Sequence, residues 1–511
     1  MSRRSIRSFL PVLFLLVSAA AALLAFTRAE SVGETATAAP DAPSAQLMPA
    51  AFASEGTAPS ADKPSQSAKT QGAPAATTAE PALPPNSLLH SARAGEAVTS
   101  IARMYLPQTP YMSTHELEAA IRRANPEIKG QSLKAGTQVI VPDVEPQPVV
   151  EHSIPRPRDF EVRAIYLTGT MAGSDTGLRI IQRWKDVGGN TIVFDIKDSD
   201  GSVNIPFEHA LAPKNHLPIR NLPKFVRWAH RLGLHVIARV AVFRDELLVR
   251  RHPELAVQSR RSGTAWRENG KLVWTDTSNT TVQDYNIALA RTAAAGGVDE
   301  VQYDYVRFPA EGDQSDAKFD FQKVEKRTRA DVIEDFLARS QQALPSGILF
   351  SLDVFGVMAW QRPVDLGHTG QDIVRMAKHC DVLSPMIYPS HFFGMDGYAA
   401  PGDAPEHFIS ESMARFAKIT TGSGVVLRPW LQAFAWRTKT YSPQYIETQV
   451  AVARKQGGIG FLFWNARNDY SKPFVAMTTM RQSPEKFFKA EKTAAAASTS
   501  IAAQNTVSAV R

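Results

Sequence analysis

Aspartates stand at the ends of several short β-branched or aromatic segments of this 511-residue chain. Asp195 ends one such segment, Asp304 a second and Asp353 a third. Two carboxyl groups can cleave a glycosidic bond when one protonates the leaving oxygen and the other attacks the sugar carbon or activates water. These residues therefore suggest two-carboxylate hydrolysis, provided that the fold brings their side chains together.

The segments that end in these aspartates read as β-strands. Short apolar runs recur along the chain, and amphipathic stretches separate them. We predict eight strands, at residues 163–169, 191–197, 236–243, 300–307, 349–355, 382–388, 426–432 and 460–464.

The stretches between the strands read as helices. Leu178, Ile181 and Trp184 fall on one helical face, and glycine follows several of these stretches, as at Gly233. Glycine readily adopts the left-handed conformation that ends a helix. Eight strand–helix repeats over 159–488 predict an α/β fold, a (β/α)8 TIM barrel. A doubly wound open sheet is the alternative, but YLTGT at 166–170 lacks the G-x-G-x-x-G phosphate loop.

In a TIM barrel the active site lies at the C-terminal ends of the strands. Asp304 and Asp353 fall on adjacent strands, which lie about 4.8 Å apart. Their carboxyl groups are then roughly 5–6 Å apart, which favours a retaining mechanism, whereas Asp195 and Asp304, two strands apart, are nearer an inverting geometry. We predict Asp304 as nucleophile and Asp353 as acid/base, with Asp195 and Lys197 binding substrate or tuning charge.

Further polar and aromatic residues near the strand ends are expected to contact substrate. Tyr388 is placed to hydrogen-bond the nucleophile or a sugar, and Trp464 to stack on a sugar face. Trp274 lies in a loop at 245–281 that is long enough to form part of a binding cleft. The predicted substrate-binding set is Asp195, Lys197, Trp274, Arg307, Tyr388, Gln432, Trp464 and Asn465.

A structural interpretation stands beside each of these roles. A buried aspartate often pairs with an arginine, and Arg239, Arg307 and Arg428 are available. Trp464 could equally fill the core. The DSDG run at 198–201 reads as a turn, because it lacks the ligand pattern of an EF-hand calcium loop.

The run DEVQYDYVRFP at 299–309 resembles the signature of DUF4015, a family of TIM-barrel proteins assigned to glycoside hydrolysis. The resemblance covers the whole large unit and implies carbohydrate breakdown by analogy with neighbouring hydrolase families. Further matching positions are Thr168-Gly169, FDIKD at 194–198, Trp274, DYN at 284–286, SPMIYP at 384–389 and FWN at 463–465.

A small unit at 88–143 resembles a LysM domain. The matching runs are HSARAGEAV at 90–98, SIARMY at 100–105, ANP at 124–126 and LKAGTQVIVP at 133–142. The pattern predicts a βααβ order, with Ser113 and Glu116 forming a capping box for the second helix. The resemblance implies binding of a glycan that contains N-acetylglucosamine, such as peptidoglycan; a βααβ spacer without a ligand is the alternative.

The N-terminus has the features of an export signal. Arg3, Arg4 and Arg7 precede an apolar run at 9–26, which predicts a signal peptide or a signal anchor. We therefore expect a periplasmic or cell-envelope protein, with a membrane anchor if the signal is retained. The predicted units are 1–29 signal, 30–87 Ala/Pro/Ser/Thr-rich linker, 88–143 LysM-like domain, 144–158 Pro-rich connector, 159–488 barrel and 489–511 disordered tail.

The composition excludes several classes of protein. Cys380 is the single cysteine, which excludes intramolecular disulfides and thiolate zinc sites. A formal charge of +7 over 511 residues is a weak argument for nucleic-acid binding, so we expect a glycan partner and no nucleic acid. No cofactor or metal is predicted, and a metal-dependent deacetylase is disfavoured because paired histidines at ligand spacing are missing. The remaining alternative is a catalytically silent glycan-binding or scaffold protein on the same barrel.

Overall fold

The computed structural model describes residues 83–489. The predicted signal segment, nearly all of the predicted linker and residues 490–511 of the predicted tail lie outside the described residues. Within 83–489 no helix is both long and apolar enough to cross a membrane.

The small unit has the predicted βααβ order. Its strands β1 (Leu88–Ser91) and β2 (Gln138–Val141) pair antiparallel. Its helices are α2 (Val98–Tyr105) and α3 (Thr114–Ala124), with a 3-10 turn η1 (Leu106–Gln108) between them. The Ser113 hydroxyl accepts a hydrogen bond from the Glu116 amide, and the Glu116 carboxylate accepts one from the Ser113 amide, so the predicted capping box is confirmed.

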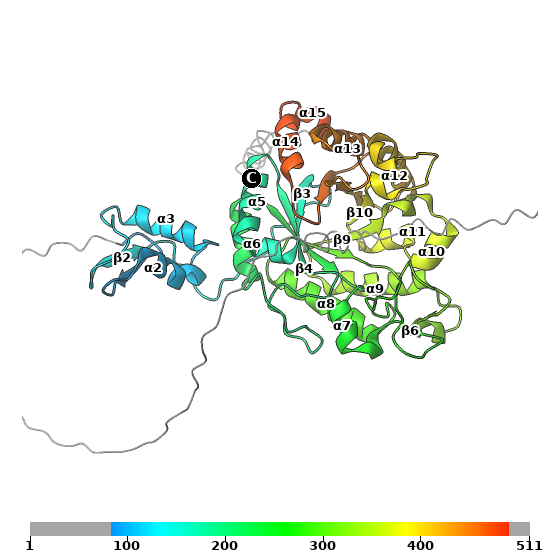
Figure 1. Cartoon of the computed structure of the whole chain (residues 1–511), viewed down its shortest axis with the longest axis horizontal. Coiled ribbons are helices and arrows are strands. Elements are labelled where there is room, and N and C mark those ends of the chain that lie inside the picture. The colour runs from blue at the N-terminus through cyan, green and yellow to red at the C-terminus, as the bar shows by residue number, and fades with distance from the viewer. Residues whose placement is uncertain (1–82, 490–511) are drawn as a thin grey trace, which may run out of the picture. The chain divides into compact units, whose positions relative to one another are not determined.

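The large unit is a closed parallel barrel, as predicted, and Figure 1 shows its strands surrounded by helices. The strand order is β3-β4-β5-β7-β9-β10, then β11 and β12 in a single position, then β13, which pairs back with β3. The strands are β3 (Val162–Leu167), β4 (Thr191–Lys197), β5 (His235–Ala241), β7 (Glu300–Asp304), β9 (Leu349–Phe355), β10 (Val382–Ile387), β11 (Val426–Leu427), β12 (Trp430–Gln432) and β13 (Gly460–Trp464).

Helices with one apolar face cover the barrel. The face predicted for Leu178, Ile181 and Trp184 is buried on α5. The helices are α4 (Gly169–Ala172), α5 (Asp175–Asp186), α6 (Leu222–Arg231), α7 (Glu246–Arg251), α8 (Thr280–Ala295), α9 (Arg329–Ala343), α10 (Pro363–Thr369), α11 (Ile373–Met376), α12 (Pro405–Ile419), α13 (Pro443–Lys455), α14 (Ser471–Met480) and α15 (Pro484–Phe487).

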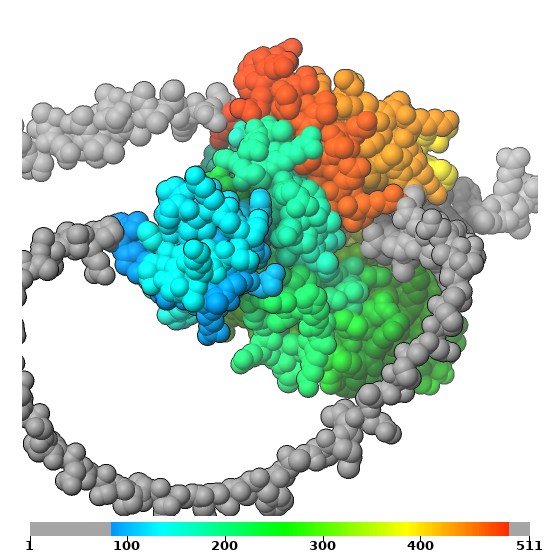
Figure 2. All heavy atoms as spheres, turned by 60° about the vertical axis from the view of Figure 1, so that its left-hand side comes forward, coloured from blue at the N-terminus to red at the C-terminus, as the bar shows by residue number. Residues whose placement is uncertain are grey.

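The end of the chain closes the ring of helices. Arg481, directly after α14, donates a hydrogen bond to the Asp186 carbonyl at the end of α5 (3.0 Å). Figure 2 shows the orange-red C-terminal helices directly beside the green-cyan segment that contains α5. The first and last strand–helix repeats are therefore neighbours, as a closed barrel requires.

Two strands depart from the predicted pattern. The predicted strand 426–432 is broken into β11 and β12 at Pro429, which has no N–H to donate to a ladder. In β4 the register with β5 shifts between Asp195 and Lys197, which is a β-bulge. A bulge interrupts the alternation of side chains, so residues two apart need not share a face.

The barrel interior is polar at both ends. Near its N-terminal end, Arg428 forms a fully buried ion pair with Glu300 (2.8 Å), and His235 contacts the same carboxylate (3.2 Å). One layer higher, Gln302 donates to the Ser384 hydroxyl (3.3 Å). The third polar layer, at the C-terminal ends of the strands, contains the predicted carboxylates.

Candidate active site

Arg239 on β5 lies at the centre of the predicted site. Its guanidinium donates hydrogen bonds to Asp195 on β4 and to Asp304 on β7, and its Nε lies 3.6 Å from Asp353 Oδ2 on β9. Burial alone would lower the pKa of Arg239, but the carboxylates of Asp195 and Asp304 raise it well above its usual value. One fixed cation therefore organises three carboxyl groups from three strands.

Asp304 is the most accessible of these three aspartates. It is 7% exposed, against 1% for Asp195 and for Asp353. Its Oδ1 accepts a hydrogen bond from the Tyr305 amide (2.5 Å), and its Oδ2 from Arg239. Tyr305 has a φ of 54°, in the left-handed region that non-glycine residues rarely adopt and that is often found at functional sites. Two donors thus stabilise a carboxylate anion at the mouth of the barrel.

Asp353 lies next to Asp304, as the adjacency of their strands predicts. The β7–β9 register pairs Tyr303 with Leu352, which puts the next residues, Asp304 and Asp353, side by side. Burial raises the pKa of Asp353 well above its usual range, and the charge of Asp304 raises it further. Its Oδ1 accepts a hydrogen bond from Trp430 Nε1 (2.7 Å), while its Oδ2 has no hydrogen-bond partner. Asp353 therefore holds its proton to a higher pH than an ordinary aspartate does.

Asp195 and Asp198 form a second carboxyl pair, at the end of β4. Tyr166 and Arg239 both donate to the Asp195 carboxylate. Burial, and then the charge of Asp195, raise the pKa of Asp198 to about 9. Asn204 Nδ2 donates to Asp198 Oδ2 (2.9 Å) and to the Asp195 carbonyl (3.1 Å). Asp198 is half-buried and protonated, so it is a functional candidate that the sequence analysis placed only in a turn.

Aromatic side chains line one side of this mouth. The Trp464 ring lies 5.7 Å from Tyr388 and 6.3 Å from Tyr166, measured between ring centroids. Burial, together with the charges of Asp353 and Asp304, raises the pKa of Tyr388 well above its usual value. The predicted positions of Tyr388 and Trp464 near the carboxylates are therefore consistent with sugar binding, and Trp464 is half-buried rather than sealed in the core.

Lys197 lies elsewhere than predicted. Its ammonium is fully buried, forms an ion pair with Asp245 (2.8 Å) and donates to the Ala241 and Val242 carbonyls and to Asn286. The bulge after Asp195 turns Lys197 away from the mouth, toward α8. The described contacts of Lys197 are therefore with the protein, and its role in binding substrate or tuning charge stays a prediction.

Arg307 and Trp274 pack against each other. The Arg307 guanidinium lies 4.7 Å from the Trp274 ring and 4.4 Å from the Phe355 ring, and it donates to the Phe308 carbonyl (3.1 Å). Arg307 is half-buried, but Trp274 is only 1% exposed. Arg307 and Tyr305 pack against the Trp274 ring, and contact between Trp274 and a sugar stays a prediction. The Trp274 ring supports the Arg307 guanidinium.

Gln432 and Asn465 use their amides within the protein. Gln432 Oε1 accepts from the Ser390 amide, and its Nε2 donates to the Phe434 carbonyl and to Thr438. Asn465 Nδ2 donates to the Ala433 and Asp469 carbonyls. Both amides fix loops at the mouth, and direct binding of a sugar by Gln432 or Asn465 stays a prediction.

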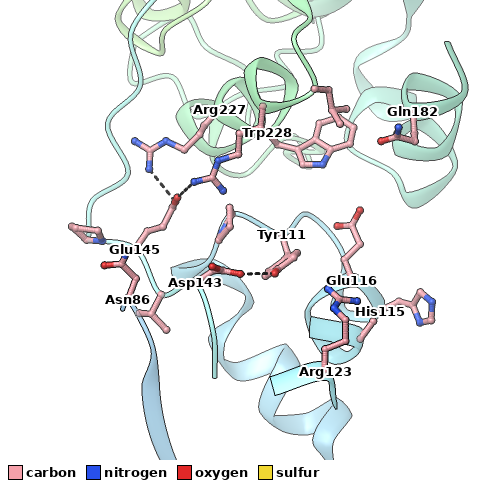
Figure 3. Close-up of a pocket in the computed structure, with 16 residues that line it drawn as sticks. Asn86, Tyr111, His115, Glu116, Arg123, Asp143, Glu145, Gln182, Arg227 and Trp228 are labelled. Carbon is pink, nitrogen blue, oxygen red and sulfur yellow. Dashed lines mark hydrogen bonds and ion pairs between the residues drawn. The ribbon is translucent and has the colours of Figure 1, made fainter. Parts of the chain in front are cut away.

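A large cavity elsewhere in the structure is distinct from this site. It has a volume of about 770 Å³ and is lined by Tyr111, Asp143, Glu145 and Arg227, among others (Figure 3). Arg227 lies on α6, whose last residues precede the N-terminal end of β5. Barrel enzymes carry their chemistry at the opposite end of the strands. Figure 3 shows Tyr111 hydrogen-bonded to Asp143 and Glu145 paired with arginine.

The carboxylates of the mouth are arranged around Arg239. Among residues 83–489, no group of three or more His, Cys, Asp or Glu side chains has an arrangement suited to a metal. The described geometry offers one carboxylate held by two hydrogen-bond donors, carboxyl groups with raised pKa values beside it, and an aromatic wall.

Several solved structures are similar to this chain. A hypothetical protein from Ruminiclostridium thermocellum is 34% identical over 37% of this chain and 97% of its own, with a TM-score of 0.32. The Bacillus cereus spore cortex-lytic enzyme SleL is 12% identical over 78% of this chain and 86% of its own, with a TM-score of 0.38. An α-galactosidase from Thermus thermophilus is 14% identical over 68% and 69%, with a TM-score of 0.39. No curated protein sequence matches the chain.

The family assignment comes from the barrel itself. The family model DUF4015, described as "Putative glycosyl hydrolase domain", matches residues 164–470. That range begins in β3, ends directly before α14 and includes every aspartate of the mouth. The chain therefore belongs to the DUF4015 family of glycosyl hydrolase-like TIM-barrel proteins.

Proposed function

We propose that this protein is an exported glycoside hydrolase that cleaves a cell-envelope glycan, peptidoglycan or another polysaccharide, by a retaining two-carboxylate mechanism. The observation that carries the proposal is the contrast between neighbours: Arg239 stabilises an anion at Asp304, while adjacent Asp353 has a strongly raised pKa. Glycosidases need one carboxylate and one carboxylic acid at the same pH, and different environments produce that difference.

Asp304 is the nucleophile in this proposal. Its carboxylate attacks the anomeric carbon and forms a glycosyl ester, while Asp353 gives its proton to the departing glycosidic oxygen. Asp353, now a carboxylate, takes a proton from water; the resulting hydroxide attacks the anomeric carbon and releases Asp304. The two steps together return Asp304 to a carboxylate and Asp353 to a carboxylic acid.

The surrounding residues support this division of roles. Arg239 and the Tyr305 amide orient the two oxygens of Asp304, and Trp430 fixes the Asp353 carboxyl group. Because Asp353 is only 1% exposed, the leaving oxygen has to enter the mouth beneath Tyr388 and Trp464. Tyr388 is proposed to hydrogen-bond the sugar or the nucleophile, and Arg307 to contact substrate at the rim.

Asp198 is a second candidate for the proton donor. It carries a proton at neutral pH, and it is more exposed than Asp353. The two acids can be distinguished with aryl glycosides, because a good leaving group needs little protonation. Replacing the true acid with asparagine should abolish activity on the natural glycan. The same variant should still form the glycosyl ester from an activated aryl glycoside.

Export and attachment to the envelope are proposed from the N-terminal apolar run and the LysM-like unit. The small unit would hold peptidoglycan or a related glycan and so concentrate the barrel on its substrate. A catalytically silent glycan-binding protein is the competing function, because the carboxylates at the mouth are nearly closed to solvent.

Release of reducing ends tests the proposal. The purified full chain is incubated with peptidoglycan sacculi and with a panel of polysaccharides, beside Asp304→Asn and an Asp335→Asn control on the exposed face of α9. We expect hydrolysis by wild type and control and a loss of at least about 10³-fold in Asp304→Asn, a typical scale for removal of a catalytic group. Unchanged hydrolysis in a folded Asp304→Asn rejects the nucleophile, and glycan binding without turnover by wild type favours the silent protein.

A further inference from the structure

A row of aromatic rings, joined at its outer end by the Arg437 guanidinium, leads from the carboxylates to the solvent-exposed rim of the barrel. We define it as the aromatic track: Trp464 at the end of β13, Phe434 and Trp436 after β12, and His391 and Phe393 after β10. Ring centroids are 5.4 Å apart for Trp464 and Phe434, and 5.9 Å apart for Phe434 and His391.

The outer part of the track continues in the same way. His391 and Trp436 are 5.0 Å apart. The Arg437 guanidinium lies 4.4 Å from the Trp436 ring and 5.1 Å from the Phe393 ring, so it joins the last two members. Exposure increases along the row: the inner rings are half-buried, whereas Phe393 is 53% exposed.

The inner end of the track reaches the candidate active site through Tyr388. The Tyr388 ring is 5.7 Å from Trp464 and from Phe434. The Trp464 ring also lies 6.3 Å from the ring of Tyr166, whose hydroxyl donates to the Asp195 carboxylate. A ligand that extends along the track would therefore have one end at the carboxylates.

The two loops that carry the track are held rigidly. Gln432 is hydrogen-bonded to the Ser390 amide in one loop and to the Phe434 carbonyl in the other. Asp403 Oδ1 accepts from the amides of Lys439 (2.7 Å) and Thr440 (2.9 Å). Rings held in fixed positions lose little entropy when a ligand binds, so a preorganised surface of this kind favours binding.

We propose that the aromatic track binds successive sugar units of a polymeric glycan, so that the barrel cuts inside chains rather than removing single terminal sugars. The inference rests on the proposed glycoside hydrolase function. A pyranose ring presents C–H groups on its faces and hydroxyls at its edge. It can therefore cover an aromatic ring and still keep its hydroxyls in water. A site for one terminal sugar would use only the rings nearest the carboxylates, whereas this row continues to the exposed Phe393.

Binding of a length series tests the track independently of hydrolysis. The full chain carrying Asp304→Asn is titrated calorimetrically with soluble glycan strands of two to ten sugars, prepared from peptidoglycan and from each polysaccharide of the panel. We expect affinity to rise with strand length. Adding Trp436→Ala or Phe393→Ala should abolish the increase for the longer strands, a loss of about tenfold, corresponding to ~1.4 kcal/mol.

A matched control comes from the other end of the barrel. Phe487 is half-buried on α15, beside residues that precede the N-terminal ends of β3 and β13, and Phe487→Ala should keep the parent length dependence. The inference is overturned if affinity rises with strand length in Trp436→Ala and Phe393→Ala as it does in the parent. It is also overturned if the parent shows no length-dependent binding to any strand tested.

The outcomes separate the two proposals. If Asp304→Asn still hydrolyses glycan, Asp304 is not the nucleophile, and the binding result for the track still stands. If Asp304→Asn loses hydrolysis but binding is unchanged in Trp436→Ala and Phe393→Ala, the track does not bind glycan, and Asp304 remains the proposed nucleophile. Early products of wild-type digestion, sized by gel filtration, should be long fragments; the release of single sugars alone contradicts internal cleavage.

Discussion

Arg239 and Asp304 form an ion pair at the mouth of the barrel, with side chains only 8% and 10% exposed. The same guanidinium holds Asp195 and lies near Asp353. The cation therefore stabilises negative charge in the site, while burial and the charge of Asp304 raise the pKa of Asp353.

Replacing Arg239 should damage both stability and activity. Arg239→Met leaves Asp195 and Asp304 buried without their cation, which costs about 3–5 kcal/mol for a broken buried ion pair. Urea unfolding measures this free energy. Arg239→Lys keeps the charge but loses the fork that reaches two carboxylates at once, so it should be intermediate. A Met variant that unfolds at the wild-type urea concentration contradicts the structural role assigned to Arg239.

Removing the Trp430 hydrogen bond should shift the pH profile. The bond from Trp430 Nε1 lowers the pKa of Asp353, so Trp430→Phe raises that pKa further. A higher pKa keeps the acid protonated to higher pH, so the alkaline limb of kcat/KM should move upward. Trp184→Phe is the control, because Trp184 Nε1 donates to the Arg163 carbonyl away from the site. The same shift in both variants would argue against Asp353 as the acid.

The raised pKa of Asp198 predicts how stability depends on pH. Below its ordinary pKa of 3.8, the group is protonated in both the folded and the unfolded chain. As pH rises toward about 9, only the folded chain keeps the proton, so this group makes folding progressively less favourable. Asp198→Asn does not titrate, so its Tm relative to wild type should increase between pH 4 and pH 9.

Exposed Glu208 provides the control for this measurement. Glu208→Gln should show no such trend in relative Tm across the same pH range. A constant Tm difference between Asp198→Asn and wild type would show that Asp198 ionises in the folded protein much as it does in the unfolded chain.

Lys197→Met should act on stability rather than on substrate binding. It leaves Asp245 buried without its cation, at a cost of about 3–5 kcal/mol. The urea midpoint should fall, while KM on the cleaved glycan, measured at a temperature where the variant is folded, stays at the wild-type value. A raised KM with an unchanged midpoint would return Lys197 to the substrate-binding residues.

The barrel and its principal carboxylates could be predicted because both depend on local patterns. Short apolar strands alternate with amphipathic helices, and parallel strands with helical crossovers close with their C-terminal ends at one side. Asp304 and Asp353 therefore had to be neighbours once their strands were adjacent. The seventh strand was predicted as continuous, and Pro429 breaks it for a reason that was visible in the sequence.

The rest of the site required the tertiary structure. A single bulge in β4 turns Lys197 out of the mouth. Strict alternation of side chains along the strand would instead place Lys197 on the same face as Asp195. Gln432 and Asn465 lie at the predicted edge of the barrel, but their side-chain amides are hydrogen-bonded to other loops. Asp198 acquires its raised pKa only because the fold buries it beside Asp195.

Sequence alone determined the class of fold, the eight strands and which carboxylates share the mouth, since hydrophobic periodicity and strand order fix backbone placement. The tertiary structure decided which of those carboxylates is paired with a cation and which keeps a proton. That choice depends on burial and on distances of a few ångströms from Arg239. In the sequence, Arg239 lies in the apolar run HVIARVA and could have paired with any nearby acid. Electrostatic interactions fall off with distance and solvent exposure, and neither quantity is specified until the chain is folded.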